Sequence, residues 1–298
     1  MSGKGQALLF MAHCADRWSV RQFRKLVRQA GDQAEIVWLW DDGSGLDGGP
    51  PTGIPVFRVG RDVGKELRYA GARPGIHPGQ QVMAVISFAK AFPDYRYYWF
   101  VEYDVWCRDW RHLLEAAAVV DADLLAIHMT EYRRCPAWYW WGRMQGELAT
   151  LDRRFLRKAF FPLYRISARA LGVLDRAYRA GGWVHHEIFV PTLLGRNGMR
   201  MMDLRSLAQA TGRARPWYTG TISDNGQMSS GSFRYRPAFL PLRLVLGRQA
   251  ELYHPVKPWS WWLREGRLVK AVARALGPGR LVSRLPLLWR LAVSRHRE

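Results

Sequence analysis

Two acidic side chains follow one of the most apolar stretches of the chain. Tyr97–Val101 is aromatic and β-branched, which is typical of a buried strand, and Glu102 and Asp104 come directly after it. Residues two apart on an extended chain point the same way, so both carboxylates are expected to reach one site. Carboxylates are costly to bury unless a cation or a hydrogen-bond donor compensates them. The pattern therefore predicts a divalent cation site at a strand's carboxyl end, where open α/β sheets bind ligands.

A strand, an acid-x-acid triplet and a following helix resemble the metal-binding motif of nucleotide-sugar glycosyltransferases with the GT-A fold. In that family a related Asp-x-Asp holds Mn²⁺ or Mg²⁺ against the donor diphosphate. Glu102 departs from the commoner Asp, so the resemblance assigns direct ligation to Asp104 more firmly than to Glu102. A solvated strand end with a helix cap is the structural alternative for this triplet.

A late Tyr-His-Pro-Val-Lys segment contains His254 and Lys257. It resembles the segment whose histidine completes the metal site in many GT-A enzymes. Imidazole suits Mn²⁺, and Lys257 is placed to contact the diphosphate as a point charge. A purely structural histidine before proline is the alternative.

Glu187 lies beside His185 and His186, before an apolar run. Such surroundings can raise the pKa of a carboxylate toward neutrality, as a general base for a sugar hydroxyl requires. In inverting GT-A enzymes the base is likewise an acid downstream of the metal motif, so the resemblance implies inversion with Glu187 as the catalytic residue. A helix-start acid that complements the helix dipole is the alternative. A chelate by the two histidines is not expected, because adjacent side chains diverge.

Further residues are predicted to bind the two substrates. Arg234 and Arg236 alternate with aromatic residues and would clamp a phosphate, or else form a solvated strand edge. The other donor-binding candidates are assigned by position after the first two predicted strands: His13, Asp16, Asp41 and Asp42. The aromatic cluster at 138–141 is either core packing or a platform for sugar rings or an acyl chain. The acceptor-binding candidates are Trp138, Trp140 and His186.

Alternating strands and helices are expected to position these residues. Strands are predicted over 6–14, 34–40, 55–59, 97–101, 122–128 and 163–167, and helices over 18–30, 78–91, 109–120 and 168–179. Residues 43–53 and most of 212–237 read as loop, with 232–236 extended. This order predicts an α/β fold, in which residues 1–258 form one GT-A-like domain with a mostly parallel sheet flanked by helices.

Composition limits the partners and the compartment. The 298 residues carry 45 basic against 25 acidic side chains, a net charge of +20, which favours anionic partners such as nucleotide sugars, phospholipid headgroups or nucleic acids. Three cysteines without metal-ligand spacing predict reduced thiols in a cytoplasmic protein: Cys14, Cys107 and Cys135. We expect no membrane-spanning segment, so the predicted location is cytoplasmic, with peripheral attachment to the inner membrane face as an option.

Residues 259–298 form a basic, tryptophan-rich and leucine-rich extension. It is predicted either to bind an anionic membrane surface or to cover the core of the catalytic domain. Together these features predict a metal-dependent glycosyltransferase that uses a nucleotide-sugar donor and a glycan or lipid-linked acceptor. A nucleic-acid-binding protein and a catalytically silent membrane-surface scaffold of the same fold are the rivals. The acids at predicted strand and helix ends argue against nucleic acid.

Overall fold

The computed structural model describes residues 5–42, 49–70, 76, 79–144, 146–182, 185–212, 215–228, 230–241, 244 and 250–263. The predicted C-terminal extension lies outside the described residues from 264 onward. Its first turn, α9 (Trp259–Leu263), is within them. The predicted domain boundary after residue 258 therefore stays a prediction.

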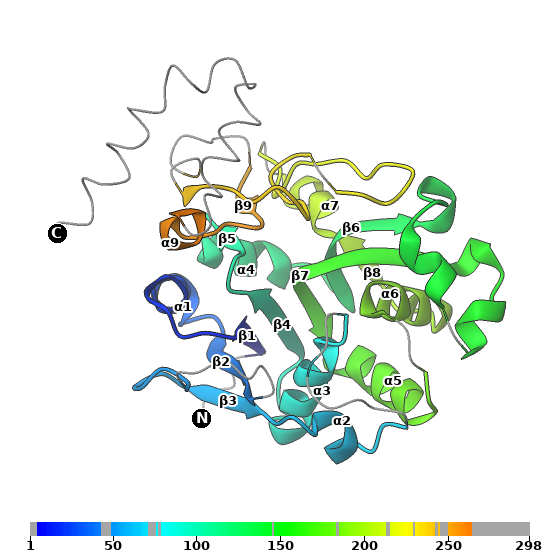
Figure 1. Cartoon of the computed structure of the whole chain (residues 1–298), viewed down its shortest axis with the longest axis horizontal. Coiled ribbons are helices and arrows are strands. Elements are labelled where there is room, and N and C mark those ends of the chain that lie inside the picture. Colours follow the sequence, from blue (N-terminus) through cyan, green and yellow to red (C-terminus); the bar gives the residue numbers. More distant parts are fainter. Residues whose placement is uncertain are drawn as a thin grey trace.

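A seven-stranded sheet forms the centre of the molecule (Figure 1). Its strands lie in the order β3-β2-β1-β4-β7-β6-β8. Their bounds are β1 (Gln6–Ala12), β2 (Glu35–Asp41), β3 (Val56–Val59), β4 (Tyr97–Glu102), β6 (Leu124–Glu131), β7 (Arg157–Ser167) and β8 (Met201–Asp203). Only β7 among them runs antiparallel to its neighbours. The predicted α/β class with a mostly parallel sheet is confirmed.

Helices cover both faces of this sheet. The helices are α1 (Arg17–Ala30), α2 (Val63–Glu66), α3 (Val82–Ala91), α4 (Trp110–Ala118), α5 (Ala168–Arg179), α6 (His186–Arg196) and α7 (Leu204–Ala210). Side chains of α1, α4 and α7 share one buried apolar cluster with β-strand residues, and those of α2, α3, α5 and α6 share the other. Strand β4 shows why: Trp99 and Val101 face the first cluster, whereas Tyr98 and Phe100 face the second.

Local sequence signals set several of these boundaries. The Asp16 side chain accepts a hydrogen bond from the Ser19 backbone N–H at 2.8 Å and so caps the start of α1. Helix α1 ends at Gly31, as predicted. Ser167 caps α5 in the same way, through the Ala170 N–H at 3.2 Å. Short elements such as α2 and β8 carry too few periodic residues to be predicted.

Strand β7 begins six residues earlier than the sequence predicts. The predicted strand starts at Leu163, whereas β7 also contains Pro162, which lacks an N–H group. In the structure, pairing of β7 with β4 ends at the Val101–Leu163 pair. The earlier part of β7 pairs with β6 through irregular register near Phe160, so a missing N–H is tolerated there.

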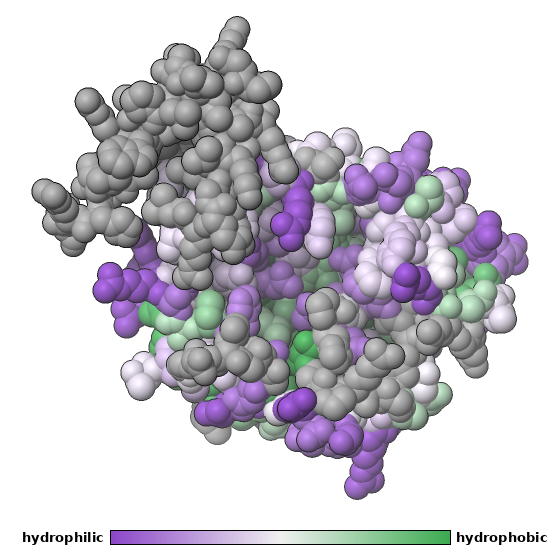
Figure 2. All heavy atoms as spheres, viewed as in Figure 1, coloured by the Kyte–Doolittle hydropathy of each residue, from purple (hydrophilic) through white to green (hydrophobic). Residues whose placement is uncertain are grey.

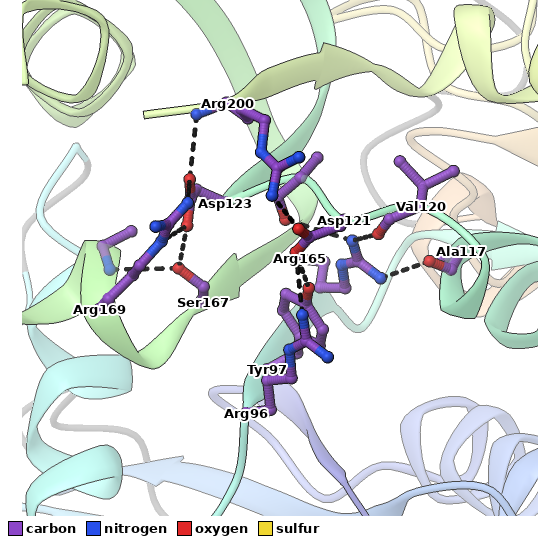
Figure 3. A network of polar contacts seen from close by, with 12 residues as sticks. Arg96, Tyr97, Ala117, Val120, Asp121, Asp123, Arg165, Ser167, Arg169 and Arg200 are labelled. Atoms are coloured by element: carbon purple, nitrogen blue, oxygen red, sulfur yellow. Dashed lines mark hydrogen bonds and ion pairs between the residues drawn. The ribbon is translucent and has the colours of Figure 1, made fainter. Parts of the chain in front are cut away.

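A polar network lies at the amino end of β4, at the opposite end of this strand from Glu102 (Figure 3). Asp123 accepts hydrogen bonds from the Ser167 hydroxyl at 2.7 Å, the Arg169 guanidinium at 2.5 and 2.6 Å, and the Arg200 backbone N–H at 3.0 Å. Burial raises the pKa of Asp123, but these donors together hold it below its ordinary value.

The buried Arg165 guanidinium belongs to the same network. It donates to three carbonyls at the end of α4 and just beyond it: Ala117 at 2.5 Å, Val120 at 2.6 Å and Ala122 at 3.2 Å. Helix carboxyl ends carry partial negative charge, which compensates a buried cation. Strand β7 is thereby tied to the carboxyl end of α4.

Two smaller features complete the fold. Strands β5 (Trp106–Cys107) and β9 (Leu252–Tyr253) form a separate antiparallel pair. Short 3-10 turns between β6 and β7 build a lobe: Tyr132–Arg134, Tyr139–Arg143, Gly146–Thr150 and Arg153–Phe155.

The visible face is mostly hydrophilic, with hydrophobic residues in small separate areas (Figure 2). No helix within the described ranges is long and apolar enough to cross a membrane.

Candidate active site

The topology predicts where a ligand should bind. Strand β1 pairs with β2 on one side and with β4 on the other, so the strand order reverses between β1 and β4. The crevice at the carboxyl ends of two such strands is the usual ligand site of open α/β sheets. Glu102 and Asp104 follow β4 at this crevice, and the Tyr103 N–H extends the pairing by donating to the Met11 carbonyl at 2.9 Å.

Glu102, Asp104 and His254 converge at this position. His254 Nε2 lies 3.8 Å from Glu102 Oε2 and 3.5 Å from Asp104 Oδ1. One potential ligand atom from each residue lies within 4.8 Å of the other two. Burial raises the pKa of Glu102 to about 8, and the Asp104 charge adds to this effect. The metal-binding set predicted from the sequence is therefore a real cluster in space.

The tautomer of His254 leaves Nε2 free to act as a ligand. Its Nδ1 lies 2.8 Å from the Arg234 carbonyl oxygen, which can only accept, so Nδ1 carries the proton. Burial lowers the pKa of His254, so the neutral ring is favoured. Nε2 and Asp104 Oδ1 are then two acceptors facing one another, and Oδ1 has no hydrogen-bond donor in the described part of the chain. A divalent cation fits such a set, since a backbone carbonyl commonly orients a metal-binding histidine.

Lys257 neutralises part of this charge. Its Nζ lies 2.6 Å from Asp104 Oδ2 and donates to the Tyr103 hydroxyl at 2.7 Å. Burial alone would lower the pKa of Lys257, but Asp104 and Tyr103 raise it above its ordinary value. Asp104 thus has one oxygen paired with an ammonium and the other directed at His254. The lysine predicted to contact the donor diphosphate lies beside the cluster.

A cavity of about 820 Å³ opens beside the cluster and extends to α6. Glu102, Asp104, His254 and Lys257 line one part of it, and Glu187 lines another. Glu187 lies in the first turn of α6, as its structural alternative predicts. Burial raises the pKa of Glu187 to about 7, while the Lys158 charge and the Phe161 backbone N–H oppose this. A carboxyl group with such a pKa can accept a proton near neutral pH.

Aromatic side chains form the wall of the cavity near Glu187. Trp138 and Trp140 both line it, and the Trp140 ring stacks on His185 at 4.3 Å between ring centroids. His186 is buried against Phe161 at 5.0 Å, and burial lowers its pKa well below the ordinary range. The three acceptor-binding candidates therefore lie on the Glu187 side of the cavity. Trp141 instead packs inward and donates to the Cys135 carbonyl at 2.8 Å.

The donor-binding candidates separate into different positions. His13 packs edge-on against Tyr103 at 4.9 Å; burial lowers its pKa, and the charges of Lys257, Asp104, Asp16 and Asp41 also act on it. These residues therefore lie near the carboxyl ends of β1, β2 and β4.

Asp42 and Arg234 bond to other groups of the protein, whereas Arg236 lines the cavity. Asp42 receives a bidentate pair from Arg58 at 2.7 and 3.0 Å. Arg234 Nε donates to the Pro237 carbonyl at 2.7 Å, and its guanidinium stacks over Phe239. Arg236 lines the cavity. Of these three candidates, Arg236 is the one that borders the same cavity as Glu102, Asp104 and His254.

The sequence interpretation missed several residues that line this cavity or lie behind its wall. Lys158 is fully buried on β7; its Nζ donates to the Gly226 carbonyl at 3.1 Å and lies 3.9 Å from the Trp138 ring. The available signal was weak, because Lys158 only adjoins the apolar run 159–164. Gly226 (φ +73°) and Gly79 (φ +87°) press on cavity rings, because an added Cβ would lie 2.2 Å from Trp138 and 2.3 Å from His185. Loop glycines give no such signal in sequence.

Comparison with known proteins gives distant structural likenesses. No family model and no curated protein sequence matches the chain. The solved structure of galactosyltransferase LgtC with donor and acceptor sugar analogs is similar to it at 12% identity over 93% of this chain and 94% of that chain, with a TM-score of 0.39. An active-site mutant of LgtC gives 13% identity, the same coverages and a TM-score of 0.42. A glycosyltransferase involved in glycosylation of the major capsid of PBCV-1 gives 8% identity over 66% of this chain and 80% of that chain, with a TM-score of 0.34. Likenesses this distant assign no function to the chain.

Proposed function

We propose that the chain is a metal-dependent glycosyltransferase of the GT-A type, which moves a sugar from a nucleotide-diphosphate donor to a hydroxyl acceptor with inversion. The observation that carries this proposal is the convergence of Glu102, Asp104 and His254 at the β1/β4 crevice, on the same cavity as Glu187. Acids at strand ends beside a cavity can hold a cation, and a cation suits a chemistry with an anionic leaving group.

Glu102, Asp104 and His254 would hold Mn²⁺ or Mg²⁺. When bound, the metal supplies positive charge to the leaving diphosphate. Lys257 adds a cation next to Asp104, and Arg236 adds another in the cavity lining. The lowered pKa of His254 supports this role, because a metal ligand must be neutral imidazole.

Glu187 would accept the proton of the acceptor hydroxyl at a carboxylate oxygen. Its pKa of about 7 leaves a substantial carboxylate fraction at neutral pH while keeping it basic enough to take a proton. Lys158, buried behind Trp138, favours the charged form of this carboxylate. Trp138 and Trp140 would bind acceptor rings by stacking and exclude water from the reacting hydroxyl.

The acceptor would be a glycan or a lipid-linked sugar. The enzyme would be cytoplasmic. Its net charge of +20 favours peripheral attachment to the anionic inner face of the membrane. Nucleic acid is disfavoured because the cavity places acids, not bases alone, among its aromatic rings.

Isothermal calorimetry with UDP and with GDP, each with and without Mn²⁺, tests the proposal. We expect one nucleotide diphosphate to bind with micromolar affinity in Mn²⁺ and at least tenfold more weakly in EDTA. The His254→Ala variant should lose the metal-dependent part alone. Binding that is equal with and without metal, or no binding of either nucleotide, would refute a metal-dependent transferase.

A further inference from the structure

A second groove of about 420 Å³ lies on the outer side of α1. It shares no lining residue with the cavity described above. Arg21, Lys25 and Arg28 line it from one face of the helix, because positions three and four apart fall on the same side. Trp106 of β5 also lines the groove. Among the described residues that line the groove, none is acidic.

These three cations lack the carboxylate partners that neighbouring basic residues have. Arg111 pairs with Asp32 at 2.7 Å, and Arg108 lies 3.6 Å from Glu251. No ion pair joins Arg21, Lys25 or Arg28 to an acid within the described ranges. Like charges gathered on one helix face cost stability. Such clustering is expected where an external anion neutralises it.

Lys25 is the most constrained of the three. Its Nζ donates to the Cys107 carbonyl at 2.5 Å and lies 4.1 Å from the centroid of the Trp106 ring. Burial and the nearby Arg108 and Arg28 charges together lower the pKa of Lys25 to about 8, while Cys107 and Asp109 oppose this. Asp109, whose charge opposes this, is occupied in capping α4 through the His112 N–H at 3.1 Å. A half-buried ammonium held in one place is a fixed anion contact.

Aromatic groups complete the groove with a donor that has no acceptor. Trp18 lines it, and the indole N–H of Trp18 is buried without a hydrogen-bond partner among the described residues. Trp18 and Trp106 together offer apolar surface for the part of a ligand that carries the anion.

From these observations we propose that the α1 groove binds a phosphate group carried on a small organic moiety, through Arg21, Lys25 and Arg28, with Trp18 and Trp106 against the organic part. An anionic phospholipid headgroup and a dissolved phosphate ester share this chemistry. The volume suits one headgroup and not a nucleic acid strand, which needs a longer track of cations and rings. The site is independent of the proposed catalysis.

The test compares two double variants of the full chain with equal charge. Arg21→Gln/Arg28→Gln removes two groove cations, whereas Arg17→Gln/Arg24→Gln removes two exposed cations of α1 that do not line the groove. Glycerol phosphate is titrated in EDTA, which silences the metal-ligating cluster. The indole N–H resonance of Trp18, assigned with a Trp18→Phe variant, reports groove occupancy.

We expect a saturable shift of that resonance in the wild type and in the Arg17/Arg24 variant. Each cation contributes about fivefold in affinity, so the Arg21/Arg28 variant should bind about 25-fold more weakly. No shift, or equal weakening in both variants, overturns the proposal. Single-stranded RNA that displaces glycerol phosphate and binds more tightly also overturns it.

Vesicle sedimentation distinguishes the two sources of the phosphate. Phosphatidylcholine vesicles with and without phosphatidylglycerol are mixed with the wild type and both double variants. Selective loss of sedimentation in the Arg21/Arg28 variant supports a phospholipid headgroup as the ligand. Equal sedimentation of the two variants, together with the glycerol phosphate shift, supports a dissolved ester.

Discussion

Replacement of Glu187 by Gln separates its predicted chemical role from a structural one. The amide is nearly isosteric but cannot accept a proton, so kcat should fall by about 10² to 10⁴. Nucleotide affinity in Mn²⁺ should stay within about twofold, because Glu187 is not among the proposed ligands. In the wild type, kcat should rise with pH through about 7, where the carboxyl group ionises.

The same substitution should increase stability at high pH. Burial raises the folded-state pKa of Glu187 from 4.5 to about 7, so the folded chain binds this proton more tightly than the unfolded chain does. The contribution of this proton to stability is complete below pH 4.5 and is lost as pH rises through 7. Above pH 7 the ionised carboxylate costs at most about 3 kcal/mol, and less because Glu187 borders an open cavity.

Urea unfolding at pH 5 and pH 8 measures this effect beside steady-state kinetics. The Gln variant should exceed the wild type in unfolding free energy at pH 8 by about 1 to 3 kcal/mol, and by little at pH 5. Glu115→Gln on the exposed face of α4 is the matched control and should change neither quantity. Loss of nucleotide binding together with turnover, or lower stability at pH 8, would refute Glu187 as a buried base.

Three further predictions concern other parts of the chain. Asp104→Ala should abolish transfer, and unchanged turnover would contradict the metal assignment. In thermal unfolding, Mn²⁺ at 100 times its Kd should stabilise the wild type by about 2.7 kcal/mol but should not stabilise this variant. Gly226→Ala should destabilise by about 1 to 3 kcal/mol because its Cβ would meet Trp138 at 2.2 Å, whereas Gly142→Ala, with no atom within 4 Å, should be nearly neutral in the same assay. Truncation after Pro258 should reduce sedimentation with anionic vesicles; a truncated chain that still sediments fully would assign the extension to packing instead.

The sheet was largely predictable because its strands are buried on both faces. Runs such as Tyr97–Val101 are continuous in apolar residues and end in turn signals, which fixes a strand and its carboxyl end. The convergence of Glu102, Asp104 and His254 was predicted through the GT-A resemblance, and the structure brings the three together. Sequence spacing alone says nothing about the approach of His254 to β4.

Other features depend on tertiary contacts that leave little trace in sequence. Strand β7 begins before the predicted strand and continues through Pro162, where β4 no longer pairs with it. Lys158 reads as a surface residue until the Trp138 ring and the Gly226 carbonyl are seen around it. Asp42 is predicted from its position to bind the donor, but its bidentate pair with Arg58 arises from the β2–β3 pairing.

The metal-ligating cluster joins residues about 150 positions apart in the chain, which has a consequence for folding. Asp104 follows an inner strand, whereas His254 and Lys257 come from the segment after β9. Such a contact closes a long loop, and its entropic cost grows with loop length, so it should form late in folding. During synthesis, a chain that has not yet reached residue 254 has the two acids without His254 or Lys257. Under the proposed function, competence for metal binding would be acquired only after the segment that carries His254 has folded onto β4, so metal affinity would be a measure of completed folding.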